Sequence, residues 1–495
     1  MKSAMKDKMR PLSRFLGSDQ AFRTAYIGTF FLASLCLIRD FFYIFAGILM
    51  IWGTALAIYK IAVKKQLTYM RNKRIIILFL GCAVLTCILH CKTHFFDNMY
   101  MVVYMGLCFF FFYGIHAGKS KSRCRRETAM ILDLLGAATT IIMAAGLVLL
   151  VIFPSGFDIN GDSFAIHENR FVGILFNANV TAFYSLMSII ICNILWAIKN
   201  SSGKLTKAGR IWYIISIAIN ALALILTDSN DSLLLLIIYF CFIAFYILFK
   251  GFKPSAVNLI IRIIALMLAC IVIAAALIAI RTLVQEGVSF LFSLTAPKAP
   301  VIVTEPGEKP ELPETTPPPT TFEHQNTNLD SGRFIIWRQS VGLFSKFPIF
   351  GIGKQNIVDY GKYYLGGLRY GDFHNGLITI IISYGLVGFF LFMVLSICVA
   401  KTMFKGIFRY RSENRRDGRV LMYITAFCTA YCAYSMFEVA LLVDLSYRIL
   451  IFWLLIGLAL SYTDSYERRA LLHHENLPVR SREIYAFANT KHSPI

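Results

Sequence analysis

Long apolar runs alternate with short polar connections along the chain, and this alternation predicts membrane-spanning helices. A helix needs about 20 mostly apolar residues to cross a bilayer, and twelve runs reach or approach that length. They lie at residues 24–38, 41–63, 75–91, 97–117, 129–153, 173–198, 211–227, 232–249, 257–280, 375–400, 420–443 and 448–462. The pattern therefore predicts an all-α polytopic membrane protein with about 12 transmembrane helices.

One polar interval, residues 281–374, is much longer than the others and separates spans 1–9 (24–280) from spans 10–12 (375–462). Within it, residues 297–321 hold eight of the fourteen prolines and show no apolar period, which predicts a disordered Pro-rich spacer. Apolar residues then recur at helical spacing, which predicts a short amphipathic helix over 331–347 at the membrane surface. The predicted apolar face contains Phe334, Trp337, Val341, Phe344 and Phe347.

The distribution of charge predicts the orientation in the membrane. The composition is 57% hydrophobic and 16% charged with a net charge of +21, and most of the 49 lysines and arginines fall in every second connection. Basic connections stay in the cytoplasm. Both termini, 1–23 and 463–495, are therefore predicted to be cytoplasmic, and 281–374 is predicted to be extracytoplasmic. Clusters this short, placed between spans, exclude a nucleic-acid-binding function.

Chemical cofactors leave no pattern in the sequence. Eleven of the twelve cysteines lie in or beside apolar runs, and the His, Asp and Glu residues show no dependable metal spacing. There is also no glycine-rich phosphate-binding loop. We therefore expect no required metal and no cofactor.

The stretch GDFHNGLITIIISYGLVG places a histidine and an asparagine, His374 and Asn375, at the start of a glycine-containing apolar run. On an ideal helix from His374, Gly385 and Gly388 lie on the same face as the histidine. Small residues allow close helix packing, so His374 is expected to point into the bundle and to accept a proton there. The alternative is a histidine that only caps a helix in the headgroup region.

Two arginines are candidate anion-binding residues. In HENRFVGILFNANVTAFYSLM, a continuous helix would place Arg170, Asn177 and Thr181 on one polar face. Arg333 begins the predicted amphipathic helix, with Arg338 and Arg369 nearby in sequence. The guanidinium fork suits a phosphate or pyrophosphate. Each arginine could instead be an ordinary interfacial or solvated charge.

Two further ionisable residues are candidates for supporting roles. Glu438 lies near the outer end of the span at 420–443, where an ionisable group is a site candidate by default. A structural ion pair with an arginine is the alternative. His167, close to Arg170, competes with His374 for a proton-transfer role.

Four blocks together resemble the O-antigen ligase and O-antigen polymerase family of membrane glycosyltransferases. They are HN followed after nine residues by GLVG (374–388), RFVG with FNAN (170–179), SGRFIIW leading to FPIFGIG (331–353) and MFEVALL (436–442). The family often has a serine-arginine pair where this chain reads TDSNDS, with Asn230, so no arginine role is carried to that position.

The resemblance implies a GT-C-like fold and a metal-independent inverting transfer from a polyprenyl-pyrophosphate-linked oligosaccharide to an acceptor hydroxyl. His374 would be the catalytic base, Arg170 and Arg333 would bind the donor pyrophosphate, and the remaining candidates would support them. The enzyme would lie in the bacterial cytoplasmic (inner) membrane with its active site outside. Polymerisation of surface polysaccharide repeat units is slightly favoured. The alternatives are a glycan ligase acting on a lipid, protein or wall acceptor and, less favoured, a flippase for the same lipid-linked sugars.

Overall fold

The computed structural model describes residues 15–36, 39–159, 161–250, 255–295, 333–368, 371–408 and 415–475. The helices at the positions of the predicted spans are α2 (Asp19–Leu32), α3 (Arg39–Ala62), α4 (Lys73–Leu89), α5 (Phe95–Leu107), α6 (Lys121–Ile152), α7 (Ala178–Ser201), α8 (Lys207–Leu226), α9 (Asn230–Phe249), α10 (Ala256–Thr295), α13 (Gly376–Phe408), α14 (Arg415–Tyr434) and α15 (Tyr447–Glu475). Two shorter helices, α11 (Arg333–Lys346) and α12 (Ile357–Leu365), follow α10.

Nine helices of the described part of the chain are long and apolar enough to cross a membrane. The remaining three are less suited, because α2 and α4 have 14 and 17 residues and α14 begins with the charged sequence RRDGR. The chain is thus a mostly helical polytopic membrane protein, as predicted. The count of twelve spans stays a prediction, as does the position of both termini in the cytoplasm.

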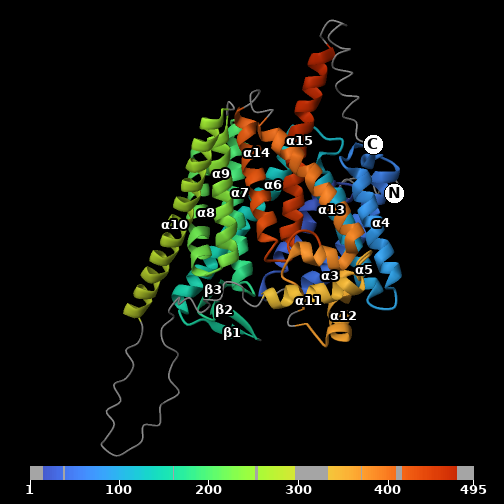
Figure 1. Cartoon of the computed structure of the whole chain (residues 1–495). Helices are drawn as coiled ribbons and strands as arrows, with labels where there is room; N and C mark the ends of the chain where they lie inside the picture. The colour runs from blue at the N-terminus through green and yellow to red at the C-terminus, as the bar shows by residue number, and fades with distance from the viewer. Residues whose placement is uncertain are drawn as a thin grey trace, which may run out of the picture.

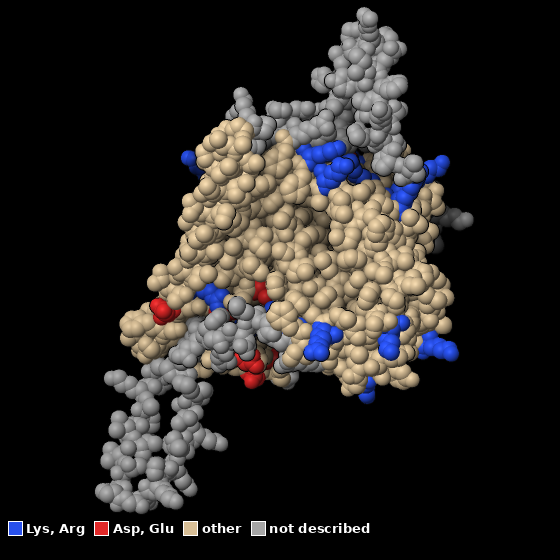
Figure 2. Space-filling model, viewed as in Figure 1, with Lys and Arg blue, Asp and Glu red and all other residues tan. Residues whose placement is uncertain are grey.

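The helices form one bundle with distinct ends. The long helices run side by side, the strands and the short helices α11 and α12 gather at the lower end in Figure 1, and the last turns of α15 extend from the upper end. A broad belt without charged residues separates the charged residues near the two ends on the face drawn in Figure 2. Such a belt suits the hydrocarbon core of a bilayer.

A small antiparallel sheet departs from the all-α prediction. Strands β1 (Phe157–Ile159), β2 (Asp162–His167) and β3 (Arg170–Gly173) pair in the order β1-β2-β3, and β3 leads directly toward α7. The continuous helix predicted to carry Arg170, Asn177 and Thr181 is therefore wrong. Asn177 instead caps α7, its side-chain oxygen accepting from the Asn179 amide at 2.7 Å, because an asparagine satisfies amides left free at a helix start.

Helix α13 is broken at Gly385, contrary to the continuous helix predicted from His374. Gly385 has φ 64° and ψ −169°, a region that only glycine adopts readily. The backbone of 348–353 pairs with the opened turn: Leu386 N–H donates to Pro348 O at 2.7 Å and Gly353 N–H to Ser383 O at 2.9 Å. A Cβ at Gly385 would lie 2.2 Å from Ile349 O. Gly385 thus allows the backbone of α13 to touch the backbone of 348–353. Because the helix is broken there, Gly385 and Gly388 do not share one continuous helix face with His374.

The amphipathic helix expected over 331–347 corresponds to α11 (Arg333–Lys346), and its position at the membrane surface stays a prediction. Phe334 and Val341 are 66% and 64% exposed, whereas Ile336, Ser340 and Leu343 are buried. The buried residues pack with Ile352, Ile357, Phe373 and Ile382 in a separate apolar cluster. A helix between protein and lipid is apolar on both sides, so periodicity does not tell which side meets the protein. The proline-rich spacer at 297–321 lies outside the described residues.

Candidate active site

Arg333 forms a bidentate ion pair at the lower end of the bundle in Figure 1. The first residue of α11 donates from its two terminal nitrogens to the two carboxylate oxygens of Asp231 in the first turn of α9, at 3.3 and 2.6 Å. Its guanidinium carbon lies 5.5 Å from the ring centroid of Phe437. The fork and the ring fix the cation in place.

Arg281 of α10 lies beside the same turn between α8 and α9. It forms an ion pair with Asp228 and donates to the Asn230 side-chain oxygen at 2.9 Å. Gln285, one turn further along α10, also donates to Asp228 at 3.0 Å. These contacts fix the second half of α10 to the turn before α9 and to its first residue.

Arg170, on β3, is positioned from two sides. Its Nε donates to the Thr227 carbonyl at 2.8 Å and a terminal nitrogen donates to the Asn179 side-chain oxygen at 2.6 Å. Burial lowers the pKa of the Arg170 guanidinium, and the charge of Asp228 acts in the opposite direction. Asn177, the residue predicted to share a helix face with Arg170, instead accepts a hydrogen bond from the backbone amide of Asn179. It is the side chain of Asn179 that contacts Arg170.

His374 stands immediately before α13 in a left-handed backbone conformation, with φ 43°. Its amide donates to Asp372 Oδ1 at 2.8 Å, and its Nε2 lies 3.6 Å from the same oxygen. The side chain is 37% exposed, so a substrate can reach it.

Asn375 is a buried N-cap. Its side-chain oxygen accepts from the amides of Leu377 and Ile378 at 3.0 Å each, and its side-chain nitrogen donates to Met436 O at 2.9 Å. Asparagine is among the best residues at this position because it satisfies otherwise free amides. Asn375 therefore links the start of α13 to the segment that follows α14, which accounts for the HN pair structurally.

Glu438 lies in that segment, beyond the end of α14 at Tyr434 and hence outside the span predicted to contain it. Burial raises the pKa of the Glu438 carboxyl, and its electrostatic interactions with Arg448 and His374 act against this. Arg333 and Asp231 also contribute to the potential at Glu438. Two residues predicted separately, His374 and Arg333, thus both lie within electrostatic range of Glu438.

Several candidates lie apart from this group. Arg338 is on the exposed side of α11, and His167 is an exposed residue of the β2–β3 hairpin whose Nδ1 lies 2.9 Å from the Ser163 hydroxyl. Arg369 lies outside the described residues. Within the described ranges, no three His, Cys, Asp or Glu side chains are arranged to hold a metal ion.

Two charged residues of the site were missed at the level of sequence. Arg281 directly follows the apolar run predicted to end at 280, and Arg448 begins the last one. Arg448 donates to the Tyr434 hydroxyl and to Asp444, each at 3.2 Å, and stacks on Phe183 at 5.6 Å. A cation at the edge of a span looks like a snorkelling residue, and only the fold shows that both point toward carboxylates.

Cations, carboxylates and a partly exposed histidine thus lie at one end of this polytopic helical protein. Residues 215–393 match the family model described as O-antigen ligase, and this match supports the family resemblance seen in the sequence motifs. The matched segment contains Arg281, Arg333 and His374, whereas Arg170 and Glu438 lie outside it. No curated protein matches the chain. The match supports a glycosyltransferase-like activity of the ligase or polymerase type on a lipid-linked glycan.

Proposed function

We propose that the protein transfers a glycan from a polyprenyl-pyrophosphate donor to an acceptor hydroxyl at the outer face of the bacterial cytoplasmic membrane, and that it polymerises surface polysaccharide repeat units. The observation that carries this proposal is the grouping of charged residues at one end of the bundle. Arg333 pairs with Asp231 and lies over the ring of Phe437, which precedes Glu438, and Asn375, next to His374, donates to the carbonyl of Met436 in the same segment. A base and fixed cations are the two components that this reaction requires.

Arg170 and Arg333 bind the departing pyrophosphate in this proposal. These contacts use two of the five N–H donors of each guanidinium, at Thr227 and Asn179 for Arg170 and at Asp231 for Arg333. The other donors are available for phosphate oxygens. Cations held in advance where negative charge develops stabilise a transition state without reorganising.

His374 removes the proton from the acceptor hydroxyl as that oxygen attacks the anomeric carbon. Attack from the face opposite the pyrophosphate inverts the configuration, and the C–O bond to pyrophosphate breaks with its electrons going to the leaving group. General-base catalysis of this kind contributes roughly 10²–10⁴-fold to the rate. Glu438, whose pKa is raised by burial, is a supporting residue close to the histidine.

A deletion strain tests this function against its alternatives. Loss of the polymerase leaves single lipid-linked repeat units in the outer leaflet, and restoring the wild-type chain removes them. Finished polymer that is made but not attached to its anchor indicates the ligase. Repeat units confined to the cytoplasmic leaflet indicate the flippase and contradict both enzyme assignments.

A further inference from the structure

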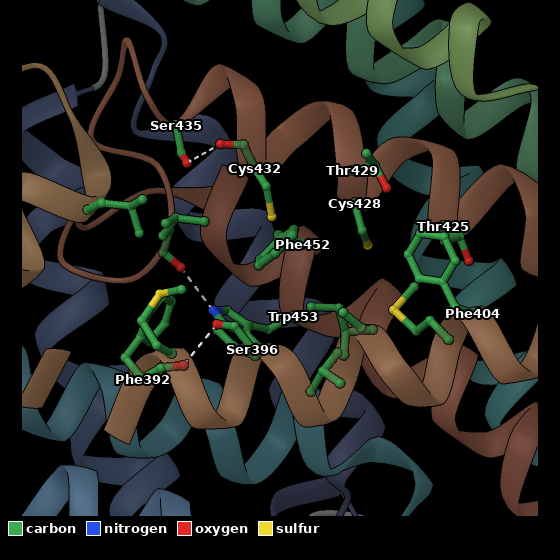
Figure 3. Close-up of a pocket in the computed structure, with 17 residues that line it drawn as sticks. Phe392, Ser396, Phe404, Thr425, Cys428, Thr429, Cys432, Ser435, Phe452 and Trp453 are labelled. Carbon is green, nitrogen blue, oxygen red and sulfur yellow. Dashed lines mark hydrogen bonds between the residues drawn. The ribbon is translucent and has the colours of Figure 1, made fainter. Parts of the chain in front are cut away.

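Two cavities of the described bundle measure about 230 Å³ each. The first lies between α13, α14 and α15, and the hydroxyls of Ser396 and Ser435 in its wall donate to the backbone carbonyls of Phe392 and Cys432 (Figure 3). The second lies between α7, α8, α9 and α10, and its mostly apolar wall includes Arg281 of α10. A cation beside an apolar wall needs partners within the protein. Those of Arg281 lie in residues 227–231, the turn that joins α8 to α9.

This turn binds arginines from three other elements. Arg170 of β3 donates to the carbonyl of Thr227 at 2.8 Å, Arg281 of α10 pairs with Asp228, and Arg333 of α11 pairs with Asp231. Three guanidinium groups thus meet two carboxylates, and each carboxylate is held by one arginine. Arg170 binds a neutral carbonyl of the turn, which leaves its charge for an anion.

The pair between Arg281 and Asp228 affects Arg170, because Asp228 directly follows the residue that Arg170 binds. Burial lowers the pKa of the Arg170 guanidinium, Asp228 is the charge that raises it most, and Arg281 lowers it. The side chains of Arg281 and Asp228 are each only 12% exposed. A carboxylate this buried is costly without a cation, and Gln285, which donates to it at 3.0 Å, carries no charge. If Arg281 lost its charge, Arg170 would be a cation close enough to replace it.

We propose that Arg281 is a positioning residue that holds the Asp228 carboxylate away from Arg170 and thereby keeps Arg170 available for the pyrophosphate of the donor. This inference rests on the proposed transferase function and concerns donor binding alone. An ion pair between Asp228 and Arg170 would occupy guanidinium N–H groups that phosphate oxygens need. The role requires a positive charge next to Asp228, whereas direct binding of phosphate by Arg281 would require the planar fork.

Donor kinetics of matched variants test the proposal. Purified full-length protein in lipid nanodiscs receives, at varied concentration, a polyprenyl-pyrophosphate-linked repeat unit whose own acceptor hydroxyl is blocked. The saturating acceptor is the same repeat unit on a polyprenyl chain without pyrophosphate, which can accept but cannot donate. Arg281→Gln removes the positive charge, Arg281→Lys keeps it, and Arg281→Gln combined with Asp228→Asn removes both charges. Arg262→Gln, in the first half of α10, is the control, because the Arg262 guanidinium binds the Leu248 carbonyl near the other end of α9.

Arg281→Gln should raise KM for the donor about tenfold and leave kcat within about twofold of wild type, because only molecules in which Arg170 is available bind the donor. Arg281→Lys and the double variant should stay within about threefold of the wild-type donor KM, and Arg262→Gln should not change it. A wild-type donor KM in Arg281→Gln would overturn the inference.

The double variant separates this role from direct donor binding and from simple tethering of α10. It contains no unpaired charge, so it should fold even if Arg281→Gln does not. A donor KM in the double variant more than about fivefold above wild type would overturn the inference, because the competing carboxylate is then absent. A wild-type protein that transfers no glycan in this assay would overturn the proposed function, and this inference with it.

Discussion

The two sides of the candidate site are built differently. On the histidine side, every contact involves the backbone: the Asn375 side chain caps the amides of α13, the Gly376 amide donates to Ser435 O, and Gly385 opens the helix to the backbone of 348–353. On the arginine side, side chains make them: Arg333 binds Asp231 and Arg281 binds Asp228. The contacts on the histidine side therefore depend on close backbone packing, and those on the arginine side depend on charge.

This difference separates two kinds of sensitivity. A close backbone contact fails when one carbon atom is added, because packed backbones cannot move apart without losing their hydrogen bonds. An ion pair tolerates small changes in shape but fails when a charge or the planar fork is lost. Substitutions on the two sides should consequently affect different observables, stability on one and substrate binding on the other.

The largest effect is expected for Gly385→Ala. The added Cβ would meet Ile349 O at 2.2 Å in a backbone conformation that alanine rarely adopts, so we expect a loss of at least about 3 kcal/mol in unfolding free energy. Thermal unfolding in detergent and the level in membranes measure it. Gly81→Ala, where a Cβ meets nothing within 4 Å, is the control and should be neutral or slightly stabilising. A Gly385→Ala protein as stable as wild type would mean that the backbone pairing is dispensable.

His374→Ala should remove catalysis and leave the fold intact. Its side chain is 37% exposed and therefore not part of the packed core, so normal membrane levels are expected. Transfer should fall by about 10²–10⁴-fold if the histidine is the base. Arg338→Ala, on the exposed side of α11, is the control. Wild-type turnover by His374→Ala would reduce the HN pair to helix capping, and His167 would be tested next.

Substituting Arg333 should impair donor binding before it impairs stability. Arg333→Ala should raise KM for the donor about tenfold, or more, and Arg333→Lys should restore little because an ammonium lacks the planar fork. Initial rates at varied donor concentration give the result. Asp231→Asn separates the two duties of the arginine: it removes the counter-charge and leaves the guanidinium free to bind phosphate. A Lys variant equal to wild type would contradict bidentate recognition.

The sequence predicts the positions of the long helices because the length of each apolar run can be counted directly in the sequence. It also places His374, Arg333 and Glu438 on the same outer face, and the structure brings these three together. The features that the sequence did not predict depend on tertiary contacts. The break in α13 at Gly385 and the strand at Arg170 both involve contacts with other segments of the chain. Periodicity assumes continuous elements, so the helix faces inferred for Arg170 and for His374 were wrong.

The proposed donor and acceptor roles follow from chemistry that the sequence only partly carries. In sequence, an arginine inside a polar loop is typical of a solvated charge. Arg281 and Arg448, at the edges of apolar runs, are typical of residues that anchor a helix at the membrane interface. Their carboxylate partners, Asp228 and Asp444, are likewise ordinary loop residues in sequence. Three-dimensional pairing, and not residue type, distinguishes them.

The smallest predicted effect concerns a charged contact that braces the backbone-built side. His94, before α5, lies 3.1 Å from Asp97 and 2.8 Å from Asp359 of α12, and nearby Asn98 accepts from the Gln355 amide at 3.1 Å. Hydrogen bonds to Asp97 and then Asp359 raise the pKa of His94 above its usual value. The raised pKa belongs to the folded state. Its stabilisation is therefore complete below the unfolded pKa of about 6.5 and is lost as pH rises through the folded value.

Because His94 and both aspartates are largely exposed, solvent screening keeps this contribution well below about 1 kcal/mol. The measurement is the thermal midpoint at acidic and at mildly alkaline pH, compared between wild type and Asp359→Asn. Wild type should lose about one degree more than the variant on going to the alkaline side, and added salt should narrow that gap. If the thermal midpoint of the variant fell more than that of wild type, the neutral form of His94 would be the one that stabilises the contact with α12. A gap as large as the Gly385→Ala effect would show that charge, and not backbone contact, dominates this side of the site.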